Sequence, residues 1–115
     1  TSRRTGRWII PKGWPMDGKT PTECAAIEAW EEAGVIGKAY PRCLGLFSYT
    51  KEMDEGEVDL PCAAMVYPVR VKSLAKDYPE AGLRKRHWAR PKRAAERVGE
   101  PELAQLLRSF DPATL

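Results

Sequence analysis

Three glutamates, Glu28, Glu31 and Glu32, stand at positions i, i+3 and i+4 of the sequence. On an α-helix this spacing places all three side chains on one face. No lysine or arginine lies four residues away to relieve their repulsion, which costs about 0.2–0.5 kcal/mol for each like-charged pair. A divalent cation would relieve it, and carboxylate oxygens suit Mg²⁺ or Mn²⁺. The triad by itself is equally typical of an acidic, solvated helix face.

Residues around the triad carry strong signals for a helix that begins near Thr20 and ends at Gly34. Thr20 is a favoured N-cap, Pro21 suits the first helical position, and Glu23 completes a capping box. Gly34 supplies the left-handed stop. A loop with two glycines over residues 12–19 leads into this helix. Such a loop beside a capped helix N-terminus and an acidic face could hold a metal-bound pyrophosphate.

The pattern over residues 13–35 resembles the box of the Nudix hydrolases, G-x5-E-x7-R-E-U-x-E-E-x-G-U, where U is a bulky aliphatic residue. The matching residues are Gly13, Glu28, Glu31, Glu32, Gly34 and Val35. The flanking residues resemble small bacterial members of the diphosphoinositol polyphosphate and dinucleoside polyphosphate branch. Three positions depart from the box, which has glutamate at Lys19, arginine at Ile27 and an aliphatic residue at Ala29.

The departure at Ile27 is the one that bears on catalysis, because the family's arginine fixes the loop and orients a catalytic carboxylate. Isoleucine can do neither. We expect another cation to take over part of this role, either Lys12 or an arginine of the N-terminal cluster, since Lys12 adjoins Gly13 in the site loop.

The resemblance implies an α/β protein with the Nudix fold, in which a mixed β-sheet is sandwiched between helices, formed by a single domain over residues 1–115. The family's first strand is missing or truncated in this chain. The resemblance also implies that Glu28, Glu31 and Glu32 are catalytic and bind the metal, with the backbone carbonyl of Gly13 as a further ligand. Such a metal would polarise the pyrophosphate and lower the pKa of its bound water. The general base is left open between Glu28 and an acid from a later loop; the later candidates are Glu52, Glu55, Glu57 and Glu80.

Basic residues near the N-terminus are candidates for binding the phosphates of the substrate. Guanidinium and ammonium groups suit phosphate oxygens, and the candidates are Arg3, Arg4, Arg7 and Lys12. Trp14 could stack on a base or ring of the substrate. We expect Trp8, Trp30 and Trp88 to be core residues instead.

Composition limits the classes of protein that this chain could be. It has 115 residues with a formal net charge of +3, and 43% of the residues are hydrophobic. These values exclude a disordered chain, a collagen-like repeat and a disulfide-dense mini-protein. The odd number of widely spaced cysteines favours a reducing compartment, and neither a membrane span nor a signal peptide is recognisable, so we expect a cytoplasmic protein.

Further elements follow from hydrophobic periodicity and from the positions of proline and glycine. We expect strands over residues 7–11, 38–50 (bent at Pro41), 62–71 and 83–89, with a loop over 51–59. Residues 91–98 and 101–110 are expected to be helical. A first strand that is absent would leave an exposed sheet edge, which invites pairing with another chain, so homodimer formation is left open.

The resemblance, together with the acidic triad, implies a Mg²⁺-dependent pyrophosphohydrolase, with Mn²⁺ as the alternative ion. Its small phosphorylated substrate would be a nucleoside diphosphate linked to another group, or a similar polyphosphate. Two alternatives are a catalytically weak protein that only binds its ligand and an RNA 5′-end pyrophosphohydrolase, the latter because residues 84–97 are basic. A pure nucleic-acid-binding module ranks last, because this tract has one aromatic residue, Trp88, besides His87.

Overall fold

The computed structural model describes residues 1–115, which form three α-helices and four β-strands. The elements in chain order are α1 (Pro21–Ala33), β1 (Val35–Ala39), β2 (Gly45–Lys51), β3 (Leu60–Val66), β4 (Val69–Leu74), α2 (Pro91–Arg97) and α3 (Pro101–Ser109), followed by a short 3₁₀ helix (Pro112–Thr114). The expected α/β class is therefore confirmed.

The strands form two antiparallel pairs, β1 with β4 and β2 with β3, and these pairs are not joined into one continuous mixed sheet. Phe47 lies opposite Ala64 in one pair, and Val35 lies opposite Leu74 in the other. The segment 62–71, expected as one strand, is divided between β3 and β4 at Tyr67 and Pro68. Proline has no N–H to donate to a ladder, so the strand ends there and the chain enters the second pair.

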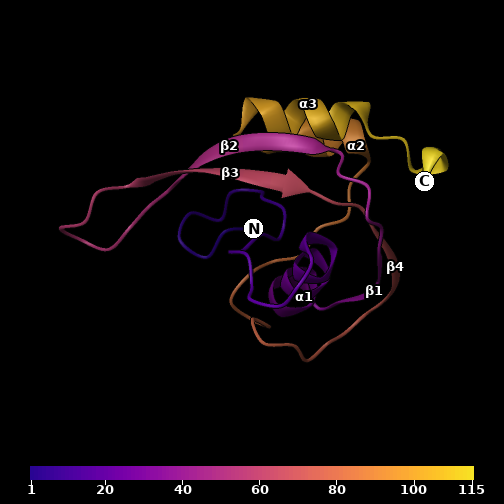
Figure 1. Cartoon of the computed structure of the whole chain (residues 1–115), viewed down its shortest axis with the longest axis horizontal. Coiled ribbons are helices and arrows are strands. Elements are labelled where there is room, and N and C mark those ends of the chain that lie inside the picture. Colours follow the sequence, from indigo (N-terminus) through magenta and orange to yellow (C-terminus); the bar gives the residue numbers. More distant parts are fainter.

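The β2–β3 pair lies between two helical layers (Figure 1). Helices α2 and α3 cover one side, and α1 with the N-terminal segment lies on the other. The core is centred on Phe47 of β2 and Leu103 of α3, which are both almost fully buried. The backbone N–H of Ser48 donates to Glu102 of α3 at 2.8 Å, so α3 also covers the outer edge of β2.

Helix α1 has the ends that the sequence predicts. The Thr20 hydroxyl accepts the N–H of Glu23 at 3.1 Å, and the Glu23 carboxylate accepts the N–H of Thr20 at 2.9 Å. These reciprocal bonds hold the pKa of Glu23 below its usual value. Gly34 ends the helix with φ of 65°, a left-handed conformation that favours glycine. The acidic triad therefore lies on a helix with fixed ends.

Two expected strands are absent. In 7–11 only Trp8 forms a bridge, to Val98, and in 83–89 only Arg84 does, to Ala81. In the second segment Arg86 instead donates to the carbonyls of Ala33 and Ala75, which ties the segment to the end of α1. These contacts take the place of a ladder.

The expectation that three tryptophans are core residues is also wrong. Trp88 is 71% exposed and Trp30 lies at the surface of α1. Trp8 is half-buried, with its ring stacked on His87 at a centroid distance of 4.9 Å.

Candidate active site

A cavity of about 420 Å³ opens beside the acidic face of α1. Its walls come from the N-terminal segment, the glycine loop, β2 and the loop that follows β2. Glu32 of α1 also lines it, together with Arg84 from the segment that follows β4. All five residues that the sequence singles out for substrate binding line it; they are Arg3, Arg4, Arg7, Lys12 and Trp14.

Gly13 and Glu28 are in direct contact. A Cβ added at Gly13 would collide with the carboxylate of Glu28. The absence of a side chain at position 13 therefore lets the Glu28 carboxylate lie against the backbone of the loop. This contact brings together two of the four residues that the sequence analysis assigned to the metal.

Glu32 is the buried member of the triad, with its side chain 7% exposed. One carboxylate oxygen accepts the backbone N–H of Lys12 at 3.0 Å, and the other pairs with Arg84 Nη2 at 3.0 Å. Glu32 therefore connects α1 to the glycine loop through one carboxylate oxygen and to the segment after β4 through the other. Arg84 supplies from a distant part of the chain the counter-charge that is missing on the helix itself.

A fourth acid, Glu80, joins this cluster. Its carboxylate pairs with Arg84 Nε at 3.2 Å and with Arg3 Nε at 3.6 Å. Its backbone N–H donates to the carbonyl of Glu31 at 3.0 Å. Of the later acids named as possible general bases, Glu80 is thus the one that lies beside the triad.

The other three later acids lie apart from the triad. Glu52 lines the cavity and pairs with Arg4 at 3.3 Å. Glu55 and Glu57 lie exposed in the loop between β2 and β3.

Two carboxylates of the cluster hold protons more strongly than an ordinary glutamate. Burial raises the pKa of Glu28, and the negative charges of Glu32, Glu31 and Glu80 raise it further. Burial also raises the pKa of Glu32, although the N–H of Lys12 and the charge of Arg84 oppose this shift. Burial is therefore the main cause of both raised pKa values, and neighbouring carboxylates add to it.

The chemistry of this donor set fits a hard divalent cation. Glu28 and Glu31 take part in none of the ion pairs, so their oxygens are available. Each carboxylate has about four lone-pair sites, so Glu32 keeps acceptor capacity beyond its two contacts. No three acidic side chains already meet in ligand geometry. A bound ion would therefore have to draw the carboxylates together.

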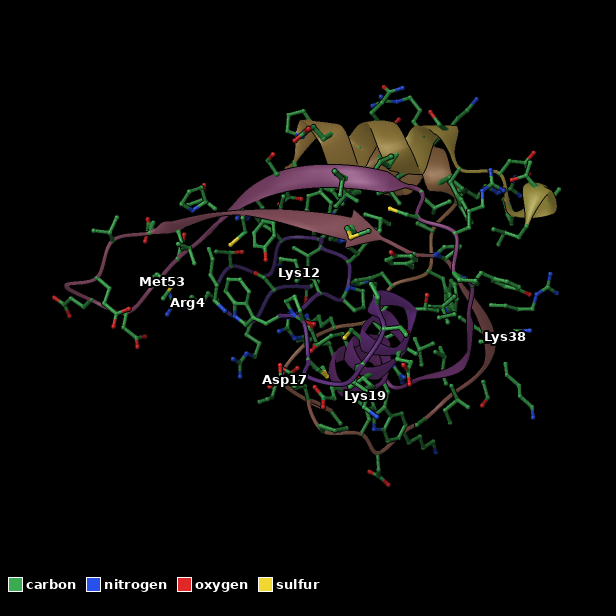
Figure 2. All side chains as sticks on the ribbon, viewed as in Figure 1. Arg4, Lys12, Asp17, Lys19, Lys38 and Met53 are labelled. Atoms are coloured by element: carbon green, nitrogen blue, oxygen red, sulfur yellow. The ribbon has the colours of Figure 1, made fainter.

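Lysines cover both aromatic rings of the cavity wall. Lys12 Nζ lies 4.8 Å from the centre of the Tyr49 ring, and Lys51 Nζ lies 4.7 Å from that of Trp14. Figure 2 shows Lys12 between the β2–β3 pair and α1, and Arg4 beside the long β2–β3 hairpin. Sequence reasoning missed Lys51, because nothing in the local sequence distinguishes it from an ordinary surface cation.

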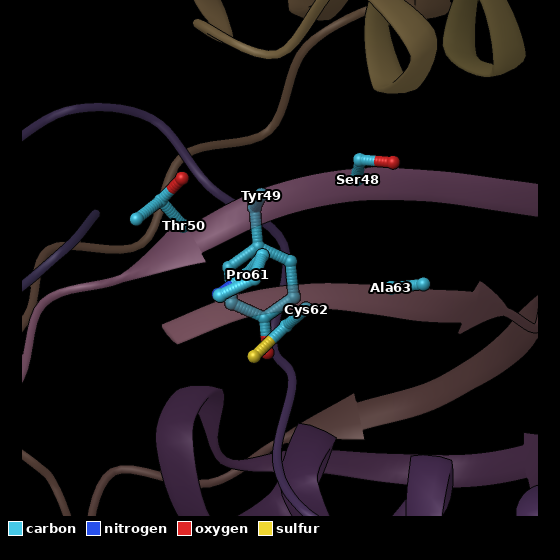
Figure 3. A pocket seen from close by; sticks show the side chains of 6 residues that line it. All are labelled: Ser48, Tyr49, Thr50, Pro61, Cys62 and Ala63. Carbon is cyan, nitrogen blue, oxygen red and sulfur yellow. The ribbon is translucent and has the colours of Figure 1, made fainter. Parts of the chain in front are cut away.

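Tyr49 forms a link between this cavity and a shallower groove on the β2–β3 pair (Figure 3). Its ring projects toward α1, beside the Sγ atom of Cys62 from the opposing strand. Burial and the neighbouring Cys62 raise the pKa of the Tyr49 hydroxyl. Tyr49 therefore stays a neutral wall residue at physiological pH.

Comparison with known proteins decides the family. The sequence pattern that defines the NUDIX domain matches residues 1–110. This chain belongs to the Nudix hydrolase family. The resemblance seen in residues 13–35 is therefore confirmed, and the match extends over almost the whole length of this chain.

Curated relatives share about a third of their residues with this Nudix chain. Nudix hydrolase 13, mitochondrial, of Arabidopsis thaliana is 33% identical over 76% of the chain and 46% of its own length. Nudix hydrolase 12, mitochondrial, of the same plant is 33% identical over 89% of the chain and 51% of its own. Human diphosphoinositol polyphosphate phosphohydrolase 3-beta is 36% identical over 76% of the chain and 50% of its own.

The chain thus spans about half the length of these relatives. No solved structure matches it. No helix in the fold is long and apolar enough to cross a membrane.

Two cations lie beside the carboxylates of this Nudix chain: Arg3, from the N-terminal cluster that the sequence analysis named, pairs with Glu80 at 3.6 Å, and Arg84 was not expected there. The Lys12 side chain lies over Tyr49, and only its backbone N–H reaches Glu32. Arg84, which belongs to neither the glycine loop nor the N-terminal cluster, pairs with Glu32 at 3.0 Å and with Glu80 at 3.2 Å. Sequence reasoning placed Arg84 in a basic tract considered for RNA binding, and no local signal linked it to α1.

Proposed function

We propose that this chain hydrolyses a phosphoanhydride bond in a small, multiply phosphorylated compound, with Mg²⁺ or Mn²⁺ as cofactor. The observation that carries the proposal is the cavity beside α1, whose lining combines Glu32 of the acid cluster with six basic side chains. These are Arg3, Arg4, Arg7, Lys12, Lys51 and Arg84. Cations suit the outer phosphates of a polyanion, and acids suit the metal ion that neutralises the phosphates undergoing reaction.

Within this class, we favour a polyphosphate without a nucleobase. The ring faces of Trp14 and Tyr49 already carry lysine ammonium groups, so a stacked base would have to displace one of them. Lysine ammonium groups are themselves suited to phosphate oxygens. The human relative is named as a diphosphoinositol polyphosphate phosphohydrolase, which supports a substrate of this kind.

The residue roles that we propose come from the family resemblance, and the contacts around α1 support them. The carbonyl of Gly13 with Glu28, Glu31 and Glu32 would hold the metal ion, which supplies a Lewis acid and activates water. Glu28, which lies against the loop and has a raised pKa, would accept a proton from the attacking water in this proposal. Arg3, Arg4, Arg7 and Lys12 would orient the phosphate groups. We take residues 1–115 as a single catalytic domain.

A nucleoside diphosphate linked to another group is the second candidate substrate. Trp14 favours it, because this residue lines the cavity and is 51% exposed, and its ring could stack on a base in place of the Lys51 ammonium group. This substrate would depend on Trp14, whereas a compound without a base would depend on the lysines.

A phosphate-release screen with Mg²⁺ tests the proposal. It would compare a diphosphoinositol polyphosphate, dinucleoside polyphosphates, nucleotide sugars and an RNA 5′-triphosphate, each with and without EDTA. We expect metal-dependent release that is fastest for the inositol compound and is lost in a Glu28→Gln variant. Faster release from the nucleotides, with a loss in Trp14→Ala, would select the second candidate.

Other results of the screen would contradict the proposal. Fastest release from RNA would support an RNA 5′-end enzyme. Tight binding of the inositol compound without any release would support a protein that only binds its ligand.

A further inference from the structure

Arg84 differs from the other arginines of the cavity because it is more buried and all of its guanidinium nitrogens already contact acceptors within the chain. Its side chain is 15% exposed, whereas those of Arg3 and Arg4 are 59% and 63% exposed. Its Nη2 pairs with Glu32 at 3.0 Å, its Nε with Glu80 at 3.2 Å, and its Nη1 donates to the carbonyl of Thr1 at 3.3 Å. All three nitrogen atoms of the guanidinium group therefore already have acceptors.

These contacts determine where the Glu32 carboxylate lies. Glu32 is held from two sides, by the Lys12 N–H on one oxygen and by Arg84 on the other. Because the side chain is almost fully buried, losing the arginine would leave an uncompensated charge in a poorly solvated place. The carboxylate would then turn toward water or take up a proton, and either response moves it away from its observed position.

We propose that Arg84 is a positioning residue for hydrolysis: it holds Glu32 and Glu80 in place and supplies, from the segment after β4, the positive charge that α1 lacks. The inference rests on the proposed function. A planar, rigid fork suits this role, because it can engage two carboxylates at fixed angles at once. A displacement of about 1 Å in a catalytic group can cost on the order of a hundredfold in rate, so the contact is relevant to turnover.

Kinetics separate this role from phosphate binding. The variants are Arg84→Gln, which removes the charge, Arg84→Lys, which keeps it without the fork, and Lys85→Gln as the matched control from the neighbouring exposed position. With a diphosphoinositol polyphosphate and Mg²⁺, we expect kcat of Arg84→Gln to fall by at least about tenfold with KM nearly unchanged. Arg84→Lys should recover part of kcat, and Lys85→Gln should resemble the wild type.

Unfolding by urea in EDTA gives a readout that needs no activity. Arg84→Gln should lower the urea midpoint, because it leaves Glu32 charged and unpaired. Adding Glu32→Gln to Arg84→Gln should raise the midpoint again, because it removes that charge.

Three results would overturn the inference. One is additive midpoint losses in the double variant, which would show that the pair does not act as a unit. Another is a rise in KM at constant kcat, which would make Arg84 a phosphate ligand. The third is an unchanged kcat in a destabilised but folded Arg84→Gln protein, which would leave only a structural role. A wild-type protein that releases no phosphate from any substrate would contradict the proposed function instead, and the urea comparison would still decide the pairing.

Discussion

At the scale of single residues, the site depends on close contacts that only particular side chains permit. Gly13 lies against the Glu28 carboxylate because it has no Cβ, and Glu32 accepts the Lys12 N–H because the glycine loop passes directly over α1. The sequence predicts these residues through their spacing. It could not predict Arg84, because that contact joins segments whose separation in the chain has no regular period.

Replacing Gly13 with alanine tests the contact with Glu28. The new methyl group would push the Glu28 carboxylate away from the loop, while the backbone at position 13 has no left-handed φ that requires glycine. We expect weaker Mg²⁺ binding and a kcat reduced by about tenfold or more, with little change in the urea midpoint. Gly99→Ala is the control, because its added Cβ meets only Arg7 Nη1 at 3.4 Å. Wild-type metal affinity in Gly13→Ala would show that the observed contact is not needed.

At the scale of elements, α1 carries the acids and its ends decide where they lie. Both ends are readable from the sequence because capping is local: Thr20, Glu23 and Gly34 act on backbone groups within a few residues. The strand over 83–89 is predicted wrongly for the opposite reason. Its pattern alternates only imperfectly, and Arg84 and Arg86 bond to α1 and to the carbonyl of Ala75 just after β4, so tertiary contacts override the weak local preference.

The capping box allows a test of the helix start. Thr20→Ala removes the hydroxyl that accepts the Glu23 N–H, so the unfolding free energy should fall by about 0.5–2 kcal/mol. Urea denaturation measures the change, with Lys19→Ala at the preceding exposed position as the control. Equal midpoints for Thr20→Ala and the wild type would mean that the cap contributes nothing to stability.

At the scale of the whole molecule, the fold brings four acids into one cluster, in which Glu32 and Glu80 pair with arginines and Glu28 and Glu31 do not. The β2–β3 pair between helical layers is the arrangement expected from the family resemblance, whereas the separation of the strands into two pairs was not foreseen. Proline positions could mark where strands end, but not which strands would pair. Because the acids are clustered, the unfolding free energy of the protein should depend on pH.

The metal-free protein should lose stability as the pH rises from about 4.5 toward neutrality. Because the folded-state pKa values of Glu28 and Glu32 lie above the ordinary value of 4.5, the folded protein binds more protons than the unfolded chain in this window. The unfolding free energy therefore decreases with rising pH until these groups are fully ionised. Urea midpoints measured in EDTA should show this trend, and Glu28→Gln should weaken it.

The cap residue Glu23 has the opposite dependence. Its lowered pKa contributes stability that is lost only as the pH falls below 4.5, so it does not mask the trend. A midpoint that rises with pH in EDTA between 4.5 and neutrality would contradict the description of the cluster.

The most direct test of the central claim is a calorimetric titration of the protein with Mg²⁺ and with Mn²⁺. We expect saturable binding to the wild type, loss of that binding in a Glu31→Gln, Glu32→Gln double variant, and unchanged binding in Glu57→Gln, a control acid in the exposed loop after β2. The physical reason is that only the α1 cluster combines several carboxylates with the backbone of the glycine loop. Equal affinity of the double variant and the wild type for both ions would contradict a metal site on this face of α1.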